Sequence, residues 1–173
     1  MSAIGGVTRR RLLEAAGVSL CAGAAQAQPL GAPSAAVVLT VRGKIQHANR
    51  TDGSAFDMAM LEALAQHSFT TKTPWYAQPR KFTGPLLRDV LALVGAHGST
   101  LRLGALNDYR IDVPADDAKR FDVTLTRLVD DRPITVREKG PLFMIYPFDS
   151  EPGLRNALYY SRSVWQLKTI DVL

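Results

Sequence analysis

Residues 84–113 have the sequence GPLLRDVLALVGAHGSTLRLGALNDYRIDV, which changes midway from a helical pattern to a strand-like one. The glycine-proline pair at its start predicts the beginning of a helix, and Gly95 predicts its end. One face of this helix carries the apolar residues Leu86, Leu87, Val90, Leu91 and Val94. After Gly95 the pattern predicts strands over residues 100–106 and 109–113.

The flanking sequence continues this alternation of short strands and short helices. The expected strands lie at 36–43, 68–73, 122–128 and 142–146 and within 163–172, and the expected helices lie at 57–64 and just after Pro114. Asp57 is the expected N-cap of the first helix, and residues 149–157 predict a loop or helical turn. Because strands outnumber the helices scattered among them, we expect an α+β fold with mixed β-sheets and a barrel-like core.

The composition indicates one globular domain. The chain has 173 residues, of which 46% are hydrophobic and 21% charged. This balance excludes a polytopic membrane protein, and the well-distributed apolar residues argue against a disordered chain. With a single cysteine, an internal disulfide or a multi-thiolate zinc site is excluded as well.

Residues 1–27 predict a cleavable export signal. An arginine cluster at Arg9, Arg10 and Arg11 precedes a modestly apolar stretch, and small residues before position 28 suit a signal peptidase. The paired arginines resemble a twin-arginine signal, with the general secretory route as the alternative. We therefore expect a periplasmic or otherwise exported protein without a stable membrane span after cleavage.

Cleavage changes both the charge and the chemistry of the chain. Residues 28–36, rich in proline and alanine, predict a flexible lead-in to a domain at 37–173. Loss of the signal removes three arginines and one glutamate, so the net charge falls from +5 to +3. The remaining basic residues alternate with acids, which argues against nucleic-acid binding. Cys21 leaves with the signal, so the mature chain has no thiol.

Several residues are candidates for a binding pocket. Asn107, Asp108 and Tyr109 predict either an ordinary β-turn or a loop that faces a pocket. Trp75 suits a cofactor cleft or the core, and Arg137 suits a cationic pocket edge or an exposed turn.

Other residues are expected to pack in the protein interior or to take no part in metal binding. Trp165 has apolar neighbours and is expected in the core. Tyr159 and Tyr160, close to Arg162, predict a ring-stacking wall or a packed corner. The three histidines lack the short spacing of a metal site.

Taken in order, several segments resemble one family, the oxidoreductase molybdopterin-binding domain family of the sulfite oxidase fold. The matching segments are Trp75, Phe82 to Leu91, Ala105 to Tyr109, Asp122 to Leu125, Gly140 to Leu142 with Pro147, and Trp165 with Ile170. The resemblance implies a compact α+β fold whose loops bury a pterin cofactor. It also implies a molybdenum ion that is held by the pterin dithiolene and one protein cysteine.

The chain departs from this family where the metal ligand is expected. The ligand cysteine of the family corresponds to residues 70–73, which are Thr-Thr-Lys-Thr. A threonine hydroxyl is a poor substitute for a soft thiolate at a transition metal. Basic residues that the family often places after its Gly-Pro-Leu triplet and before its last tryptophan are replaced by Phe143 and Val164.

Three functions follow from this comparison. The first is an exported binding or accessory module that lacks the molybdenum ligand, with a small ligand or a pterin held by Trp75, Asn107, Asp108, Tyr109 and Arg137. The second is an active molybdopterin-dependent oxidoreductase with non-thiolate metal ligation. The third is a sensory or structural partner of another periplasmic protein, without a small ligand.

Overall fold

The computed structural model describes residues 30–173, so the expected export signal lies outside the described residues. Its longer strands are β1 (Val37–Gly43), β2 (Ser54–Asp57), β3 (Gln66–Thr73), β4 (Tyr76–Pro85), β5 (Thr100–Ala105), β6 (Arg110–Pro114) and β11 (Leu167–Val172). The shorter strands are β7 (Thr124–Thr126), β8 (Leu128–Val129), β9 (Arg132–Pro133) and β10 (Phe143–Ile145). The helices are α1 (Met58–Glu62), α2 (Leu87–Leu93), α3 (Asp117–Arg120), α4 (Ala157–Arg162) and the 3-10 turns η1 (Val136–Glu138) and η2 (Pro152–Leu154).

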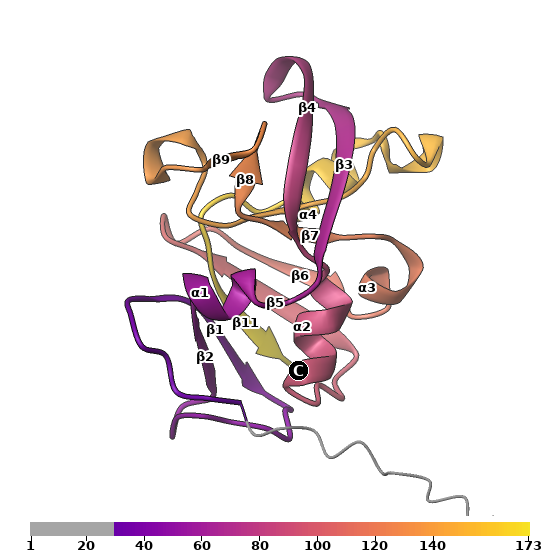
Figure 1. Cartoon of the computed structure of the whole chain (residues 1–173). Helices are drawn as coiled ribbons and strands as arrows, with labels where there is room; N and C mark the ends of the chain where they lie inside the picture. Colours follow the sequence, from indigo (N-terminus) through magenta and orange to yellow (C-terminus); the bar gives the residue numbers. More distant parts are fainter. Residues whose placement is uncertain (1–29) are drawn as a thin grey trace, which may run out of the picture.

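The strands form three sheets, which confirms the α+β class (Figure 1). The largest sheet has the order β2-β1-β11-β5-β6, in which β1 and β11 are parallel and the other neighbours are antiparallel. A second sheet has the order β3-β4-β8-β9, and β7 pairs with β10. The mixed sheet agrees with the sequence, but all three sheets are open where a barrel-like core was expected.

The large sheet buries one face and exposes the other. Leu39 and Val41 of β1, Leu101 and Leu103 of β5 and Ile170 of β11 are fully buried, whereas the residues between them are partly or fully exposed. This alternation is typical of a strand with one solvated face. Helix α2 adds Leu87, Val90 and Leu91 to the same core.

On the outer face of the large sheet, opposite charges lie in a row across four strands. Arg42 of β1 pairs in register with Asp171 of β11, which in turn faces Arg102 of β5 and then Asp112 of β6. Arg42 forms an ion pair with Asp171, and Arg102 forms one with Asp112 at 2.8 Å. The charges on this face therefore pair with one another across strands that are distant in sequence.

Asp57 caps α1 as the sequence predicted. Its Oδ1 accepts a hydrogen bond from the Met60 amide at 2.9 Å, and its Oδ2 accepts bonds from the amides of Ser34 and Ala35 at 2.7 and 3.0 Å. These donors, the Met60 amide above all, hold the pKa of the Asp57 carboxyl below its ordinary value. One carboxylate thus fixes both the start of α1 and the segment that leads into β1.

The Gly84-Pro85 pair does not open a helix, which corrects the sequence prediction. Both residues belong to β4, and α2 begins only at Leu87. The glycine is needed for packing, because a Cβ atom at position 84 would lie 2.1 Å from the carbonyl oxygen of Leu125 in β7. The sequence also failed to predict β4 itself, which contains two prolines and is held as a strand by its pairing with β3.

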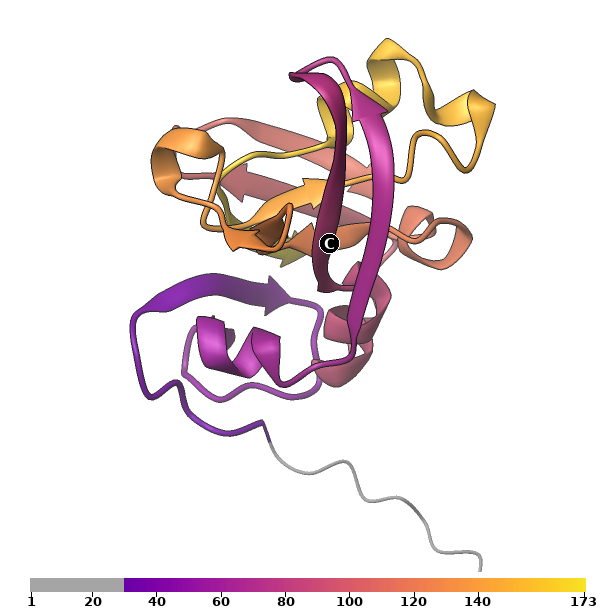
Figure 2. The same ribbon diagram turned by 45° about the horizontal axis from the view of Figure 1, so that its top comes forward.

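The β3–β4 hairpin extends from the body of the domain, and α4 lies alongside it (Figures 1 and 2). Thr71 of β3 accepts a hydrogen bond from the Asp149 amide at 3.0 Å, and the Asp149 carboxylate accepts one from the Lys72 amide at 3.0 Å. The hairpin therefore lies against the segment that leads into α4.

Within residues 30–173, no helix combines the length and the apolar character that a bilayer crossing requires.

The close approach of β4 to β7 makes a testable prediction. Replacing Gly84→Ala forces a side chain against the Leu125 carbonyl, so we expect the free energy of unfolding to fall by about 1–3 kcal/mol, as in other overpacked sites. Urea denaturation measures this change. The control is Gly153→Ala, where the new methyl group meets no atom within 4 Å. Equal stability of the two variants would contradict the packing role of Gly84.

Candidate ligand-binding site

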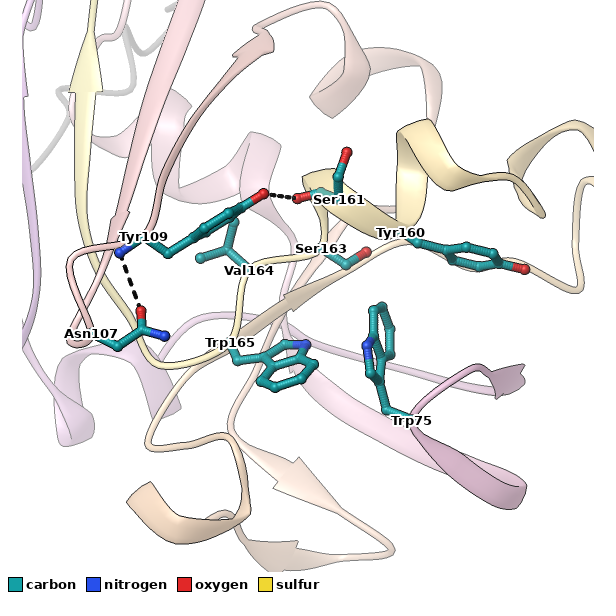
Figure 3. Close-up of a pocket in the computed structure, with 8 residues that line it drawn as sticks. All are labelled: Trp75, Asn107, Tyr109, Tyr160, Ser161, Ser163, Val164 and Trp165. Carbon is teal, nitrogen blue, oxygen red and sulfur yellow. Dashed lines mark hydrogen bonds between the residues drawn. The ribbon is translucent and has the colours of Figure 1, made fainter.

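A cavity of about 240 Å³ lies between the tip of the β3–β4 hairpin and the segment that connects α4 to β11 (Figure 3). It is lined by Trp75, Asn107, Tyr109, Tyr160, Ser161, Ser163, Val164 and Trp165. These residues come from the β3–β4 turn, the β5–β6 turn, the end of α4 and the strand entry after it. The pocket is therefore assembled from three parts of the chain that are distant in sequence: the β3–β4 turn, the β5–β6 turn and residues 160–165.

Three rings form what we call the aromatic corner: Trp75, Tyr160 and Trp165. The ring centroids of Trp75 and Trp165 are 5.8 Å apart with an angle of 86° between the planes, and those of Trp75 and Tyr160 are 6.1 Å apart at 80°. Edge-to-face contacts of this kind are favourable for aromatic pairs. The fully buried ring of Phe143 packs against Trp75, with 5.4 Å between the two ring centroids.

The β5–β6 turn supplies the opposite wall. The Asn107 side-chain oxygen accepts a hydrogen bond from the Tyr109 amide at 3.2 Å, and Asp108 has a left-handed φ of 65°. The Tyr109 hydroxyl donates to the Ser161 carbonyl at 3.0 Å and so connects the turn to the end of α4 (Figure 3). The sequence interpretation of these residues as a β-turn is confirmed, and the same turn also faces the pocket.

Gln166 connects the entry of β11 to the β5–β6 turn and to the η1 segment. Its amide donates to the Lys139 carbonyl at 2.9 Å, its carbonyl accepts from the Leu106 amide at 3.0 Å, and its side chain donates to the Val136 carbonyl at 2.8 Å. Gln166 has a φ of 50°, an uncommon conformation for a residue other than glycine. These bonds fix Trp165, its neighbour in the chain, relative to η1 and the β5–β6 turn.

The end of α4 is held by a buried polar cluster. Both the Tyr146 hydroxyl and the Arg162 guanidinium donate to the same carboxylate oxygen of Asp117, each at 2.8 Å. Asp117 is 3% exposed and Tyr146 is fully buried. Burial raises the pKa of the Tyr146 hydroxyl, and its bond to Asp117 raises it further, so the hydroxyl remains a donor at neutral pH. Tyr159 packs against both Tyr146 and Arg162, while Tyr160 faces the pocket.

The hydrogen-bonding groups around the pocket are mainly unused donors. Within the described part of the chain, no hydrogen bond involves the indole N–H of Trp75 or Trp165 or the side-chain amide nitrogen of Asn107. The hydroxyls of Ser161 and Ser163 already donate to the carbonyls of Leu158 and Tyr159. The pocket is thus suited to a ligand that accepts hydrogen bonds, because an indole N–H is a donor only.

Of the residues that the sequence singled out, Trp75, Asn107 and Tyr109 lie together in this pocket. Asp108 lines a different cavity, of about 320 Å³, on the outer face of the large sheet. Arg137 is exposed in η1 and lines none of the cavities described here.

Trp165 is not a core residue, which corrects the prediction from its apolar neighbours. It is 39% exposed, because the chain turns at Gln166 and directs the indole away from Val164 and Leu167, which are buried. Sequence reasoning also missed Ser163 and the connecting role of Gln166. No sequence motif marks that role, since it depends mainly on backbone bonds.

The segment where the family resemblance places a metal ligand does not fit that role. Thr71 is 1% exposed, and its hydroxyl donates to the Lys72 carbonyl at 3.3 Å while it accepts from the Asp149 amide. The Thr73 hydroxyl accepts from the Trp75 amide at 3.3 Å. Among residues 30–173, no three His, Cys, Asp or Glu side chains are grouped to hold a metal ion. The donor set at these positions is hard, weak and already engaged within the protein.

Comparison with known proteins adds no assignment: no family model matches the chain, and no curated protein matches it.

The buried cluster at Asp117 makes the second prediction. Asp117→Ala leaves the Arg162 guanidinium and the Tyr146 hydroxyl without their acceptor, so we expect a loss of about 3–5 kcal/mol in the free energy of unfolding. Tyr146→Phe removes one hydrogen bond to the carboxylate and should cost about 1.5–3 kcal/mol. Urea denaturation measures both losses.

The matched control is Asp116→Ala, which removes the exposed carboxylate next to Asp117. A loss for Asp116→Ala as large as that for Asp117→Ala would show that the cluster contributes nothing beyond the general effect of a charge at the start of α3.

Proposed function

We propose that this chain is an exported binding module whose aromatic corner holds a small, flat, ring-containing ligand. The observation that carries the proposal is the combination of Trp75, which meets both Tyr160 and Trp165 edge to face, with unused N–H donors around one cavity. A flat ring can stack on an indole face while its heteroatoms or substituents accept these hydrogen bonds.

The size of the cavity limits the ligand. Pockets for drug-sized molecules are about 300–1,000 Å³, and this one is about 240 Å³. One ring or two fused rings fill such a space, whereas a dinucleotide does not. The ring system of a pterin lies within this limit.

The proposal includes the family suggested by the sequence. We propose a sulfite-oxidase-type domain that has lost its molybdenum ligand and keeps a binding or accessory role in the periplasm. The engaged hydroxyls of Thr71 and Thr73 support this loss, because they leave no soft ligand where the family has its cysteine. The paired Arg9 and Arg10 in the predicted signal support export by the twin-arginine route.

Both tryptophans of the chain lie in the aromatic corner, so intrinsic fluorescence reports on this pocket alone. The test compares benzamide with cyclohexanecarboxamide, which has a similar size but a puckered ring. We expect benzamide to change the tryptophan emission saturably and to bind at least several-fold more tightly in calorimetry, because only a flat ring stacks on the indoles. Equal binding of the two amides, or no binding of benzamide, would contradict the proposal.

Trp165→Ala tests whether this corner is the site of binding. We expect it to weaken benzamide binding about tenfold or more, as the loss of an aromatic anchor does at other binding sites. The control is Leu158→Ala, which shortens an exposed side chain on α4 that does not line the pocket and should leave the affinity unchanged.

A separate measurement addresses the alternative functions. Protein exported by cells grown with molybdate is purified and analysed for molybdenum and for pterin released on denaturation. We expect no stoichiometric molybdenum, because no residue of the mature chain supplies a thiolate. Stoichiometric molybdenum together with released pterin would favour the active oxidoreductase. Stable co-purification with another protein, and no affinity for flat rings, would favour the structural or sensory partner.

A further inference from the structure

The charges around the pocket are not balanced. Nine lysines and arginines within residues 30–173 have an ion-pair partner. Arg137 and Lys139 have no ion pair in that part of the chain. They lie in η1 and directly after it, in the segment that Gln166 joins to the pocket. The surroundings of the aromatic corner therefore carry unpaired positive charge.

Lys139 is the cation closest to the rings of the pocket. Its ammonium nitrogen lies 4.9 Å from the ring centroid of Trp165 and 5.0 Å from that of Tyr76. Both distances are within the range of a cation–π contact. The ammonium thus rests against a ring that itself lines the cavity.

The backbone holds Lys139 in this place at some conformational cost. Its φ is 82°, a left-handed conformation that disfavours side chains. The Gln166 amide donates to its carbonyl and joins it to the residue after Trp165. Sparsely populated backbone conformations that the surrounding structure enforces tend to cluster at ligand sites.

Negative charge near the pocket is scarce. None of the eight lining residues is acidic. Asp108 lines the other cavity, and the Glu138 carboxylate accepts a hydrogen bond from the Thr135 hydroxyl at 2.9 Å. A cationic ligand would find no carboxylate among the lining residues, and it would approach rings of which one already contacts an ammonium.

We propose that Lys139 is a specificity-determining residue and that the ligand of this pocket is an aromatic carboxylate. This inference rests on the proposed function, since it assigns a charge to the flat ring that the aromatic corner holds. The Lys139 ammonium contacts the indole on which the ligand ring stacks, and salt at about 0.1 M, with a Debye length of about 10 Å, does not fully screen charges at such short range. Lys139 therefore favours an anionic substituent over a neutral or positive one.

The experiment measures the affinities of benzoate, benzamide and benzylammonium for the folded chain by calorimetry at 0.1 M salt. We expect benzoate to bind about 3–10-fold more tightly than benzamide, as one unpaired charge at this range allows, and benzylammonium to bind most weakly. In Lys139→Gln the affinity for benzoate should fall to that for benzamide, while the affinity for benzamide stays the same. At 1 M salt the preference of the unmodified chain should disappear.

The matched control is Lys119→Gln, which removes the same charge from the exposed surface of α3 and should leave all three affinities unchanged. Equal binding of benzoate and benzamide to the unmodified chain would overturn the inference and leave the proposed function standing. A loss of benzamide binding in Lys139→Gln would overturn it too, because Lys139 would then only support the pocket. If none of the three probes binds to the unmodified chain, the proposed function itself fails.

Discussion

The hydrogen bonds of β11 hold this domain together, because the last strand of the chain lies in the middle of the largest sheet. It pairs in parallel with β1 on one side and antiparallel with β5 on the other. Strand β1, from the beginning of the domain, and strand β5, from its middle, are therefore joined in one sheet only through the C-terminal strand between them. This pairing fixes Trp165 and Gln166, the two residues that precede the strand. Trp165 lines the pocket, and Gln166 makes the hydrogen bonds to the β5–β6 turn and to η1.

This arrangement explains how a small domain positions three parts of the chain that are distant in sequence around one cavity. Sheet pairing fixes the entry to β11, the Gln166 bonds attach η1 and the β5–β6 turn to it, and the Asp117 cluster holds α4. Trp75 then brings the tip of the β3–β4 hairpin to Trp165 through an edge-to-face contact. The rings are oriented before any ligand arrives, which lowers the entropic cost of binding.

The local elements were largely visible in the sequence, whereas the contacts between them were not. Asp57 as an N-cap and the strands around residues 100–113 follow from short-range patterns, and the structure confirms them. Strand β4 was hidden because its prolines and Gly84 oppose strand propensity, and only pairing with β3 and the close approach to β7 explain it. The sequence predicted no element over residues 158–162, where most of α4 lies. This short helix is capped by the Asn156 side chain, and its end is held by the buried Asp117.

The site follows the same division. Trp75, Asn107 and Tyr109 stood out as pocket candidates from their residue types and order, and they do meet in one cavity. The exposure of Trp165 and the role of Gln166 depend on a left-handed backbone conformation that no propensity reveals. The placement of Lys139 against Trp165 likewise arises from a contact between segments distant in sequence.

The most direct test of the central claim, that the aromatic corner binds a flat ring, uses the two indole N–H groups of the chain. In a ¹⁵N–¹H correlation spectrum of the folded protein they give two side-chain signals, one from Trp75 and one from Trp165. Titration with benzoate should move both signals saturably and with one dissociation constant. Two stationary indole signals, with shifts confined to residues outside the pocket, would contradict the account.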